Sequence, residues 1–228
     1  MSYRLHPDFR IQKLSIGREG APLAVIDNLV ADAEQLVEMA ATKSYGGVAS
    51  YYPGVRAKAP LTYHQFVLGE LRELFTGYFG IQSRPVRITS CHFSLITTPP
   101  DKLDHLQCIP HVDSYMSNEL AFVHYLFKRN HGGTAFYRHR ATGFEYIDQA
   151  RRSEYSPYID KERAMPDYPK GYINGDTPYY ERIGHQDGVF NRMLIYRRNS
   201  LHSGAIAADF IVDGNPRTGR LSLNGFVA

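Results

Sequence analysis

Residues 86–97 read VRITSCHFSLIT and alternate between two sets of side chains. Ile88 and His92 belong to one set, and Thr89 and Phe93 belong to the other. Side chains two residues apart project to the same side of a strand, and β-branched residues favour strands. The stretch therefore predicts a long strand with two different faces, at the point where the chain changes from helical to strand periodicity.

The segments around this strand indicate the fold class. Upstream, a short apolar run predicts a strand over 23–27, and helical spacing predicts helices over 33–41, with Asp32 as N-cap, and over 63–79. Downstream, apolar runs predict strands over 120–127, 134–139, 192–196, 201–206 and 220–227. Two helices followed mostly by strands predict a mainly β (α+β) fold, a sandwich or barrel with the N-terminal helices packed on one side.

Length, charge and cysteine content narrow the class of protein. The 228 residues predict a single domain, in which 1–84 supply an N-terminal strand and helical support and 85–228 supply the core. The net charge of +3 is spread without a basic block, and no apolar run approaches the roughly 18 residues of a membrane-spanning helix. Cys91 and Cys108 are the only cysteines, too few for a disulfide scaffold. We expect a cytoplasmic protein that binds neither nucleic acid nor membrane.

Two stretches lack clear helix or strand patterns. Residues 44–60, rich in Gly, Tyr and Pro, predict a loop. Residues 149–187 contain six tyrosines and almost no aliphatic residues, so they predict an insertion that covers a core built elsewhere. Because tyrosine is enriched at interfaces and mobile loops often shield active sites, we expect this insertion to be either a lid or the interface of a homodimer.

Three His-x-Asp pairs are candidate metal ligands, because residues i and i+2 of a strand can hold one ion between them. The pairs are His6/Asp8, His111/Asp113 and His185/Asp187. The first precedes every predicted core element, and the last ends the Tyr-rich stretch, where a polar turn accounts for it. His111/Asp113 precedes two strands joined at a Gly-Gly turn, a position that suits a site at the mouth of a β-barrel. We therefore favour this second pair.

A third ligand should come from a distant strand, so that three groups converge on one ion. His202 follows an apolar strand and is the strongest candidate, with a hydrogen-bonded core histidine as the alternative reading. Two imidazoles and one carboxylate form the facial triad of non-haem Fe(II) oxygenases, whereas a structural zinc site favours thiolates and closes all four positions.

Arg220 and Ser222 share one face of the last predicted strand. A guanidinium and a hydroxyl so arranged can bind a carboxylate, with bidentate geometry at the arginine. Taken alone, Arg220 would be a surface residue of an edge strand. Beside a metal triad, it becomes a candidate ligand-binding residue.

These motifs follow one another in a recognisable order. It runs His111-Val112-Asp113, Tyr125-Leu126-Phe127, Gly132-Gly133-Thr134-Ala135, Asn191 to Tyr196, His202 and Arg220 to Phe226. Over residues 85–228 this order resembles the Fe(II)/2-oxoglutarate-dependent dioxygenase superfamily, in particular its prolyl-hydroxylase-like branch. The segment Tyr52-Pro53-Gly54-Val55-Arg56 resembles an uncharacterised bacterial subgroup. The resemblance implies a double-stranded β-helix, the cupin-like jelly roll, carrying the Tyr-rich insertion 149–187.

The same resemblance implies a metal site and a reaction. His111, Asp113 and His202 would bind Fe(II). Halogenating relatives replace the carboxylate ligand by a small residue, so the presence of Asp113 favours hydroxylation or a related oxidation, with release of succinate and CO2.

The resemblance also implies how 2-oxoglutarate is held. Arg220 would bind its distal carboxylate and Ser222 would add a hydrogen bond, while Tyr125 either reaches that carboxylate or is a core aromatic residue. The substrate stays open between an amino-acid-like, a peptidyl and another small molecule. Arg56, His105 and Arg138 are polar candidates near it, and each is alternatively a solvated side chain.

Rival functions remain open from the sequence. One is a non-catalytic binding module of the same cupin-like fold, in which iron is lost or structural. Another is a different, 2-oxoglutarate-independent metal enzyme on a cupin-like barrel, in which His105, His111 and His202 would be the ligands. In a variant of the oxygenase hypothesis, Asp187 and His185 pair with His202. Only 15 residues separate Asp187 from His202, which is room for one strand, so we rank that variant low.

Overall fold

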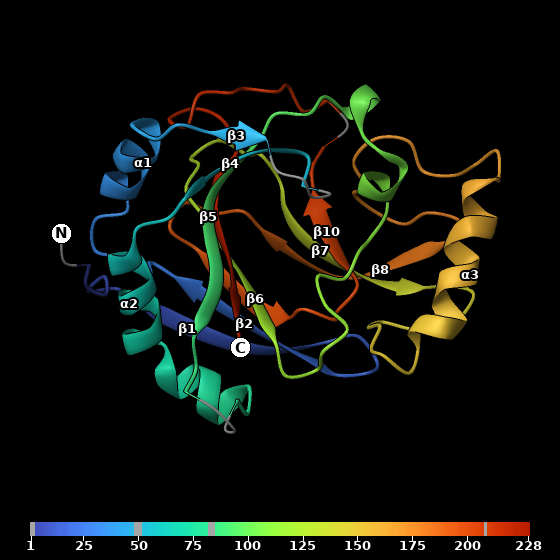
Figure 1. Cartoon of the computed structure of the whole chain (residues 1–228), viewed down its shortest axis with the longest axis horizontal. Helices are drawn as coiled ribbons and strands as arrows, with labels where there is room; N and C mark the ends of the chain where they lie inside the picture. Colours follow the sequence, from blue (N-terminus) through green and yellow to red (C-terminus); the bar gives the residue numbers. More distant parts are fainter. Residues whose placement is uncertain (1–2, 48–51, 82–84, 208) are drawn as a thin grey trace.

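The computed structural model describes residues 3–47, 52–81, 85–207 and 209–228, which form a mostly β fold of two antiparallel sheets (Figure 1). In spatial order, the large sheet contains β1 (Arg10–Ile16), β2 (Ala21–Asp27), β9 (Met193–Arg197), β6 (Leu120–Tyr125), β11 (Leu221–Val227), β5 (Ile88–Ile96), β4 (Gly54–Lys58) and β3 (Gly46–Gly47). The small sheet contains β10 (His202–Ala205), β7 (Gly133–His139) and β8 (Tyr180–Asp187). The predicted strand over 86–97 is confirmed as β5.

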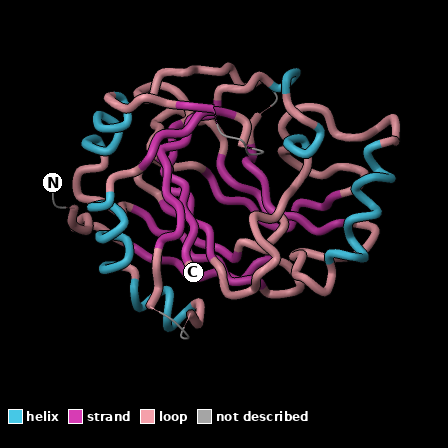
Figure 2. Tube along the Cα trace, in the orientation of Figure 1, coloured by secondary structure: helices cyan, strands magenta, loops and turns pink. Residues whose placement is uncertain are grey.

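Helices lie at the periphery of the strands (Figure 2). The helices α1 (Glu34–Ala41) and α2 (Leu61–Glu70), with a π-helical turn at Leu74–Tyr78, lie on one side, and α3 (Arg152–Arg163) lies on the opposite side (Figure 1). Among the described residues, no helix has both the length and the apolar character that crossing a membrane requires.

Strand alternation gives the large sheet two different faces. Phe93 of β5 and Leu223 of β11 belong to the main hydrophobic cluster, together with Val67 of α2. This outer face therefore packs against α1 and α2. The intervening residues point to the inner face, where Tyr196 of β9 meets Phe136 of β7 in the small sheet, with ring centroids 5.2 Å apart.

The inner face has an apolar and a polar half. On β2 and β9 it is apolar, because Val25 and Leu194 pack there in one cluster with Phe136. On β4, β5 and β11 the inward positions are polar instead, and they include Arg56, His92, Ser94, Ser222 and Asn224. Because interior polar groups normally find hydrogen-bond partners, the polar half is the part of the fold that is suited to bind a ligand.

The Tyr-rich stretch covers the small sheet, as the prediction of a covering insertion requires. Tyr155 and Tyr168 pack with Ala135 and Tyr137 of β7 in a second cluster. The hydroxyl groups of Tyr155 and Tyr180 hydrogen-bond each other at 2.9 Å. These tyrosines are therefore part of the interior on this side of the protein.

The structure corrects several sequence predictions. Residues 44–60 are not a loop throughout, because β4 joins the edge of the large sheet by backbone hydrogen bonds to β5 (residues 48–51 lie outside the described ranges). Residues 1–84 are more than support, since β1, β2, β3 and β4 belong to that sheet. Asp32 does not cap α1; it binds the side chain of Gln35 instead.

The predicted insertion 149–187 is also shorter than expected. Its last eight residues form β8, which pairs with β7 along its whole length. The sequence of β8 is polar because its side chains are only partly covered, so it lacks the apolar run of a central strand.

A buried histidine of β6 connects α2 to the segments that follow β2 and precede β9. Tyr63 Oη lies 2.9 Å from His124 Nδ1, and His124 Nε2 lies 3.1 Å from Asn191 Oδ1. The Asn191 amide also exchanges two hydrogen bonds with the backbone of Val30, so its Oδ1 is an acceptor. His124 must therefore carry its proton on Nε2 and accept from Tyr63 at Nδ1. A neutral imidazole satisfies this network.

This network predicts a loss of stability in acid. Burial lowers the pKa of His124 to about 4, against 6.5 in an exposed histidine. Between these values the unfolded chain binds a proton that the folded chain refuses, so the free energy of unfolding should decrease by about 2–3 kcal/mol as the pH falls from 7 to 4.5. Urea unfolding at both pH values measures this decrease.

The variant His124→Leu separates this effect from other titrations. It should be less stable than the wild type at pH 7 but lose less stability on acidification. His6→Gln is the control and should retain the wild-type pH dependence. An unchanged pH dependence in His124→Leu would contradict the buried neutral histidine.

Candidate metal centre

Two backbone hydrogen bonds bring His111 and His202 together. The His111 amide donates to the His202 carbonyl at 2.9 Å, and the His202 amide donates to the His111 carbonyl at 3.0 Å. This antiparallel bridge makes the two histidines direct cross-strand neighbours, whose side chains project to the same side. Asp113 follows two residues after His111, and its amide donates to the Arg198 carbonyl at 2.8 Å. The three side chains therefore face one point.

The distances within this group suit a metal ion. His111 Nε2 lies 3.9 Å from Asp113 Oδ1, and His202 Nε2 lies 3.4 Å from Asp113 Oδ2. One ligand atom from each residue lies within 4.8 Å of the other two. Metal–ligand bonds are about 2 Å long, so two atoms on one ion lie up to about 4 Å apart. Small side-chain rotations bring all three onto one ion.

The protonation of the histidines also suits a metal ion. His202 Nδ1 lies 2.9 Å from the Ser200 carbonyl, which can only accept, so the proton is on Nδ1 and the Nε2 lone pair faces Asp113. Desolvation by the surrounding residues and the neighbouring His202 lower the pKa of His111 to about 4. About half of the His111 side chain nevertheless faces solvent, at 49% exposure. His111 is thus available as a neutral ligand at neutral pH.

Residues that were not singled out in the sequence hold this group in place. Arg198 donates to the backbone carbonyl of Asp113 at 2.9 Å and forms an ion pair with Glu119 at 2.7 Å. The ring of Tyr196 lies 4.7 Å from that of His202. The sequence shows Arg198 only as one of two consecutive arginines after a strand, which carries no signal for this role.

The predicted cofactor residues lie together on the inner face of the large sheet. Ser222 pairs in register with Ser94 on one side and with Tyr125 on the other. Arg220 is buried and donates from Nε to the His131 carbonyl at 2.9 Å and from Nη2 to the Gly133 carbonyl at 2.8 Å. Tyr125 is buried, and its ring lies beside Arg220. Its hydroxyl group lies 2.6 Å from Thr134 Oγ1.

Two further tyrosines, Tyr52 and Tyr172, lie close to Arg220. Burial raises the pKa of Tyr52, and the nearby Arg220 charge lowers it in part. Tyr172, from the Tyr-rich stretch, donates to the Thr98 carbonyl at 2.7 Å and also interacts with the Arg220 charge. Ser222 Oγ is buried and makes no hydrogen bond of normal geometry with the described residues, although the Tyr52 hydroxyl lies beside it. The sequence had no signal for Tyr172 at this site.

The other candidate residues lie elsewhere or are already paired. His6/Asp8 and His185/Asp187 are separate neighbours, with nitrogen–oxygen distances of 4.0 and 3.7 Å, and their aspartates are mostly exposed. His105 lies 3.0 Å from Asp104 and is not part of the three-residue group. Arg138 is bound by Glu145 and Glu181. Of the three polar residues predicted to lie near a substrate, Arg56, His105 and Arg138, only Arg56 lies on the inner face of the large sheet.

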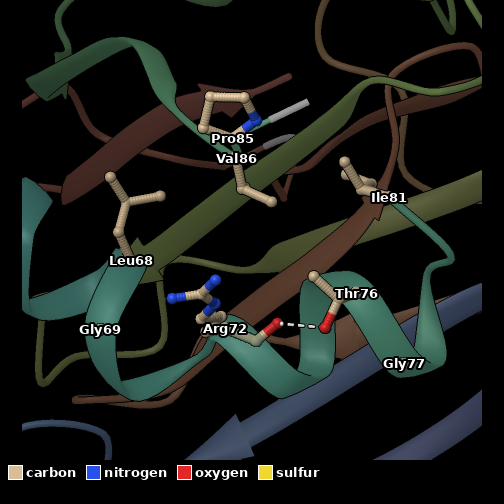
Figure 3. A pocket seen from close by; sticks show the side chains of 8 residues that line it. All are labelled: Leu68, Gly69, Arg72, Thr76, Gly77, Ile81, Pro85 and Val86. Carbon is tan, nitrogen blue, oxygen red and sulfur yellow. Dashed lines mark hydrogen bonds between the residues drawn. The ribbon is translucent and has the colours of Figure 1, made fainter. Parts of the chain in front are cut away.

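A separate hollow of about 770 Å³ lies beside α2 and the following π-helical turn (Figure 3). Figure 3 shows Leu68, Ile81 and Val86 around it, and Thr76 Oγ1 donating to the Arg72 carbonyl at 3.0 Å. It shares no residue with the His111, Asp113 and His202 group. Its lining offers one charged side chain and no metal ligand, so it is not the candidate site.

The fold is similar to that of a solved protein that binds nickel and 2-oxoglutarate. HygX from Streptomyces hygroscopicus, with nickel and 2-oxoglutarate bound, gives a TM-score of 0.51 at 10% identity, over 90% of this chain and 82% of HygX. An N-substituted L-amino acid dioxygenase from Burkholderia ambifaria AMMD gives 0.45 at 10% identity, over 96% of this chain and 94% of the dioxygenase. At these identities the likeness concerns the fold alone.

The family follows from the sequence itself. The chain belongs to the family of unknown function DUF6445, whose model matches residues 7–227. No curated protein matches the chain.

Removal of one carboxylate tests the metal centre. Asp113→Ala should weaken Mn(II) binding by about 100-fold or more, because even supporting residues around metal ligands contribute 10- to 100-fold. Isothermal titration with Mn(II) measures the affinity. The control is Asp187→Ala, which changes the exposed aspartate of another His-x-Asp pair and should bind Mn(II) like the wild type. Equal affinities in Asp113→Ala and the wild type would contradict a metal site here.

Proposed function

We propose that this protein is an Fe(II)- and 2-oxoglutarate-dependent oxygenase, formed by the whole chain 1–228 as one domain. The observation that carries the proposal is the convergence of two imidazoles and one carboxylate at the rim of a polar interior face. This donor set matches the facial triad of non-haem iron oxygenases and leaves three adjacent coordination positions for other ligands.

The strand order supports a jelly-roll core of the prolyl-hydroxylase-like kind. In the large sheet the central strands follow the order β9, β6, β11 and β5, and in the small sheet the His111 bridge continues the order β10, β7 and β8. With the His111 bridge counted as a strand, the consecutive strands from β5 to β11 thus alternate between the two sheets, except that β7 and β8 both lie in the small sheet and pair with each other, an arrangement that suits a double-stranded β-helix. The likeness to HygX, which binds nickel and 2-oxoglutarate, agrees with this assignment.

The donor set and the interior face fit both cofactors. His111, Asp113 and His202 would hold Fe(II). Arg220 would bind the distal carboxylate of 2-oxoglutarate, its guanidinium being oriented by the two backbone carbonyls to which it donates. Ser222 Oγ, buried and without a good partner in the described residues, would donate a hydrogen bond to the same carboxylate.

The reaction would follow from what these cofactors supply. When bound, they would let O2 oxidise two molecules at once: one oxygen atom enters succinate as 2-oxoglutarate loses CO2, and the other enters a substrate C–H bond, which we propose to be a hydroxylation. The chain's own part is to keep the His111 imidazole neutral, to hold the Asp113 backbone through Arg198, and to exclude water with the apolar half of the inner face. The substrate would be an amino-acid-like, peptidyl or other small molecule that reaches the metal from the exposed side of His111.

Anaerobic titration with Fe(II) and 2-oxoglutarate tests this function. The complex should develop a weak visible charge-transfer band that needs both components and is absent in His111→Ala. In air, the same protein should release succinate from 2-oxoglutarate. A well-folded protein that binds Mn(II) but gives no band would favour a metal-binding module without 2-oxoglutarate.

The 2-oxoglutarate site has its own variants. Ser222→Ala should weaken 2-oxoglutarate binding by about 10-fold, the effect of one hydrogen bond to a charged group, at little cost in stability because the hydroxyl lacks a good partner. Arg220→Gln should weaken it further. Arg217→Gln, which removes an exposed arginine paired with Glu38, is the control and should leave the affinity unchanged. An unchanged affinity in Ser222→Ala and Arg220→Gln would contradict the assignment.

A further inference from the structure

One cation on the inner face has no role in the function proposed above. Arg56 lies in β4 and pairs in register with Ser94, which in turn pairs with Ser222. Its neighbour Ala57 is buried in the main cluster on the outer face, so Arg56 points inward. Arg56 thus belongs to the same row of the sheet as Ser222 and Tyr125, two strands away from Ser222.

The Arg56 guanidinium stacks on Tyr52 and lies within the electrostatic influence of Asp113. Its central carbon lies 4.2 Å from the centroid of the Tyr52 ring. Its Nε is buried and has no hydrogen-bond partner in the described part of the chain. Burial lowers the pKa of Arg56, and the Tyr52 hydroxyl and the Asp113 carboxylate offset this in part. Arg56 and Asp113 are therefore electrostatic neighbours, although no ion pair between them is formed.

The other arginines around the site differ in this respect. Arg198 pairs with Glu119, Arg138 pairs with Glu145 and Glu181, and Arg220 donates to two backbone carbonyls. A buried guanidinium nitrogen without a hydrogen-bond partner is costly, because its lost hydration is not replaced. The half-buried Arg56, whose Nε is in this position, can therefore take an anion as a further partner.

Charge balance indicates where that anion comes from, and this step rests on the proposed function. A divalent metal ion, the Asp113 carboxylate, the 2-oxoglutarate dianion and Arg220 together carry no net charge. Arg56 then leaves one positive charge in the interior. Both carboxylates of 2-oxoglutarate already have partners, at the metal and at Arg220, so the matching anion belongs to the substrate.

A second unsatisfied group lies on the same face. Asn224 Oδ1, one row further along β11, is buried and accepts no hydrogen bond from the described residues. It offers an acceptor to a substrate N–H or O–H group, whereas Arg56 offers donors. We propose that Arg56 binds a carboxylate of the substrate, which is a small carboxylic acid carrying a hydrogen-bond donor, with a free α-carboxylate as the group that matches the planar guanidinium fork.

Matched acids and amides test this inference. The probes are the N-acetyl derivatives of the common amino acids, each as the free carboxylate and as the primary carboxamide. Saturation-transfer NMR measures their binding and needs no metal. Relaxation of the acetyl protons by Mn(II), in the protein loaded with Mn(II) and 2-oxoglutarate without oxygen, then shows whether a bound probe lies near the metal.

We expect one or more carboxylates to bind near Mn(II), and the corresponding carboxamides to bind at least about 10-fold more weakly. Arg56→Gln should abolish this preference while 2-oxoglutarate affinity stays at the wild-type value. Arg56→Lys, which keeps the charge but loses the fork, should retain part of it. Lys58→Gln removes the same charge two residues along β4, on an exposed side chain, and should behave like the wild type.

The outcomes separate this inference from the proposed function. Failure of Mn(II) and 2-oxoglutarate to bind the wild type overturns the proposed function. Saturation transfer measures carboxylate binding without the metal, so it tests the inference on Arg56 even in that case. The inference on Arg56 is overturned if no carboxylate is preferred over its amide, or if Arg56→Gln keeps the preference. The inference is also overturned if Arg56→Gln lowers the affinity for 2-oxoglutarate, because Arg56 would then belong to the cofactor site.

Discussion

The pairing of His111 with His202 is the constraint on which the candidate site depends. Two backbone hydrogen bonds join chain segments that are 91 positions apart, and they make both imidazoles neighbours on one side of the small sheet. Backbone pairing fixes this geometry without using the side chains, which remain available as ligands. Asp113 lies two residues after His111, so in an extended chain its side chain projects to the same side as that of His111. The hydrogen bond from its amide to the Arg198 carbonyl holds that extended conformation.

The large sheet complements this arrangement through its two faces. The strands β4, β5 and β11 send alternate residues into the core beneath α1 and α2 and toward the interior opposite the small sheet. Phe93 and Leu223 stabilise the sheet through their contacts in the core. The alternate residues that face the interior are therefore not needed for apolar packing. That freedom permits Ser94, Ser222 and Asn224 to remain polar in a buried environment, where unsatisfied groups would otherwise destabilise the fold.

Sequence patterns predicted those parts of the fold that are regular and apolar. The alternation in β5 and the apolar runs of β6 and β9 were found because their burial follows strand periodicity. The strands β4 and β8 were missed because they lie at or near sheet edges and bury few side chains. Arg198 was missed for another reason: it acts through the backbone of Asp113, and such contacts leave no periodic signal.

The sequence by itself determined the alternating strands, the two amphipathic helices and the inventory of groups that can bind a metal or a carboxylate, because these depend on local periodicity and residue chemistry. It also suggested His111, Asp113 and His202 through the order of their motifs. Only the tertiary structure decided that these three meet while His185 and Asp187 pair apart from them, and that Arg56 lies beside Tyr52 and near Asp113. The physical reason is that such meetings depend on register between strands distant in the chain, where a shift of one residue would turn every side chain to the opposite face.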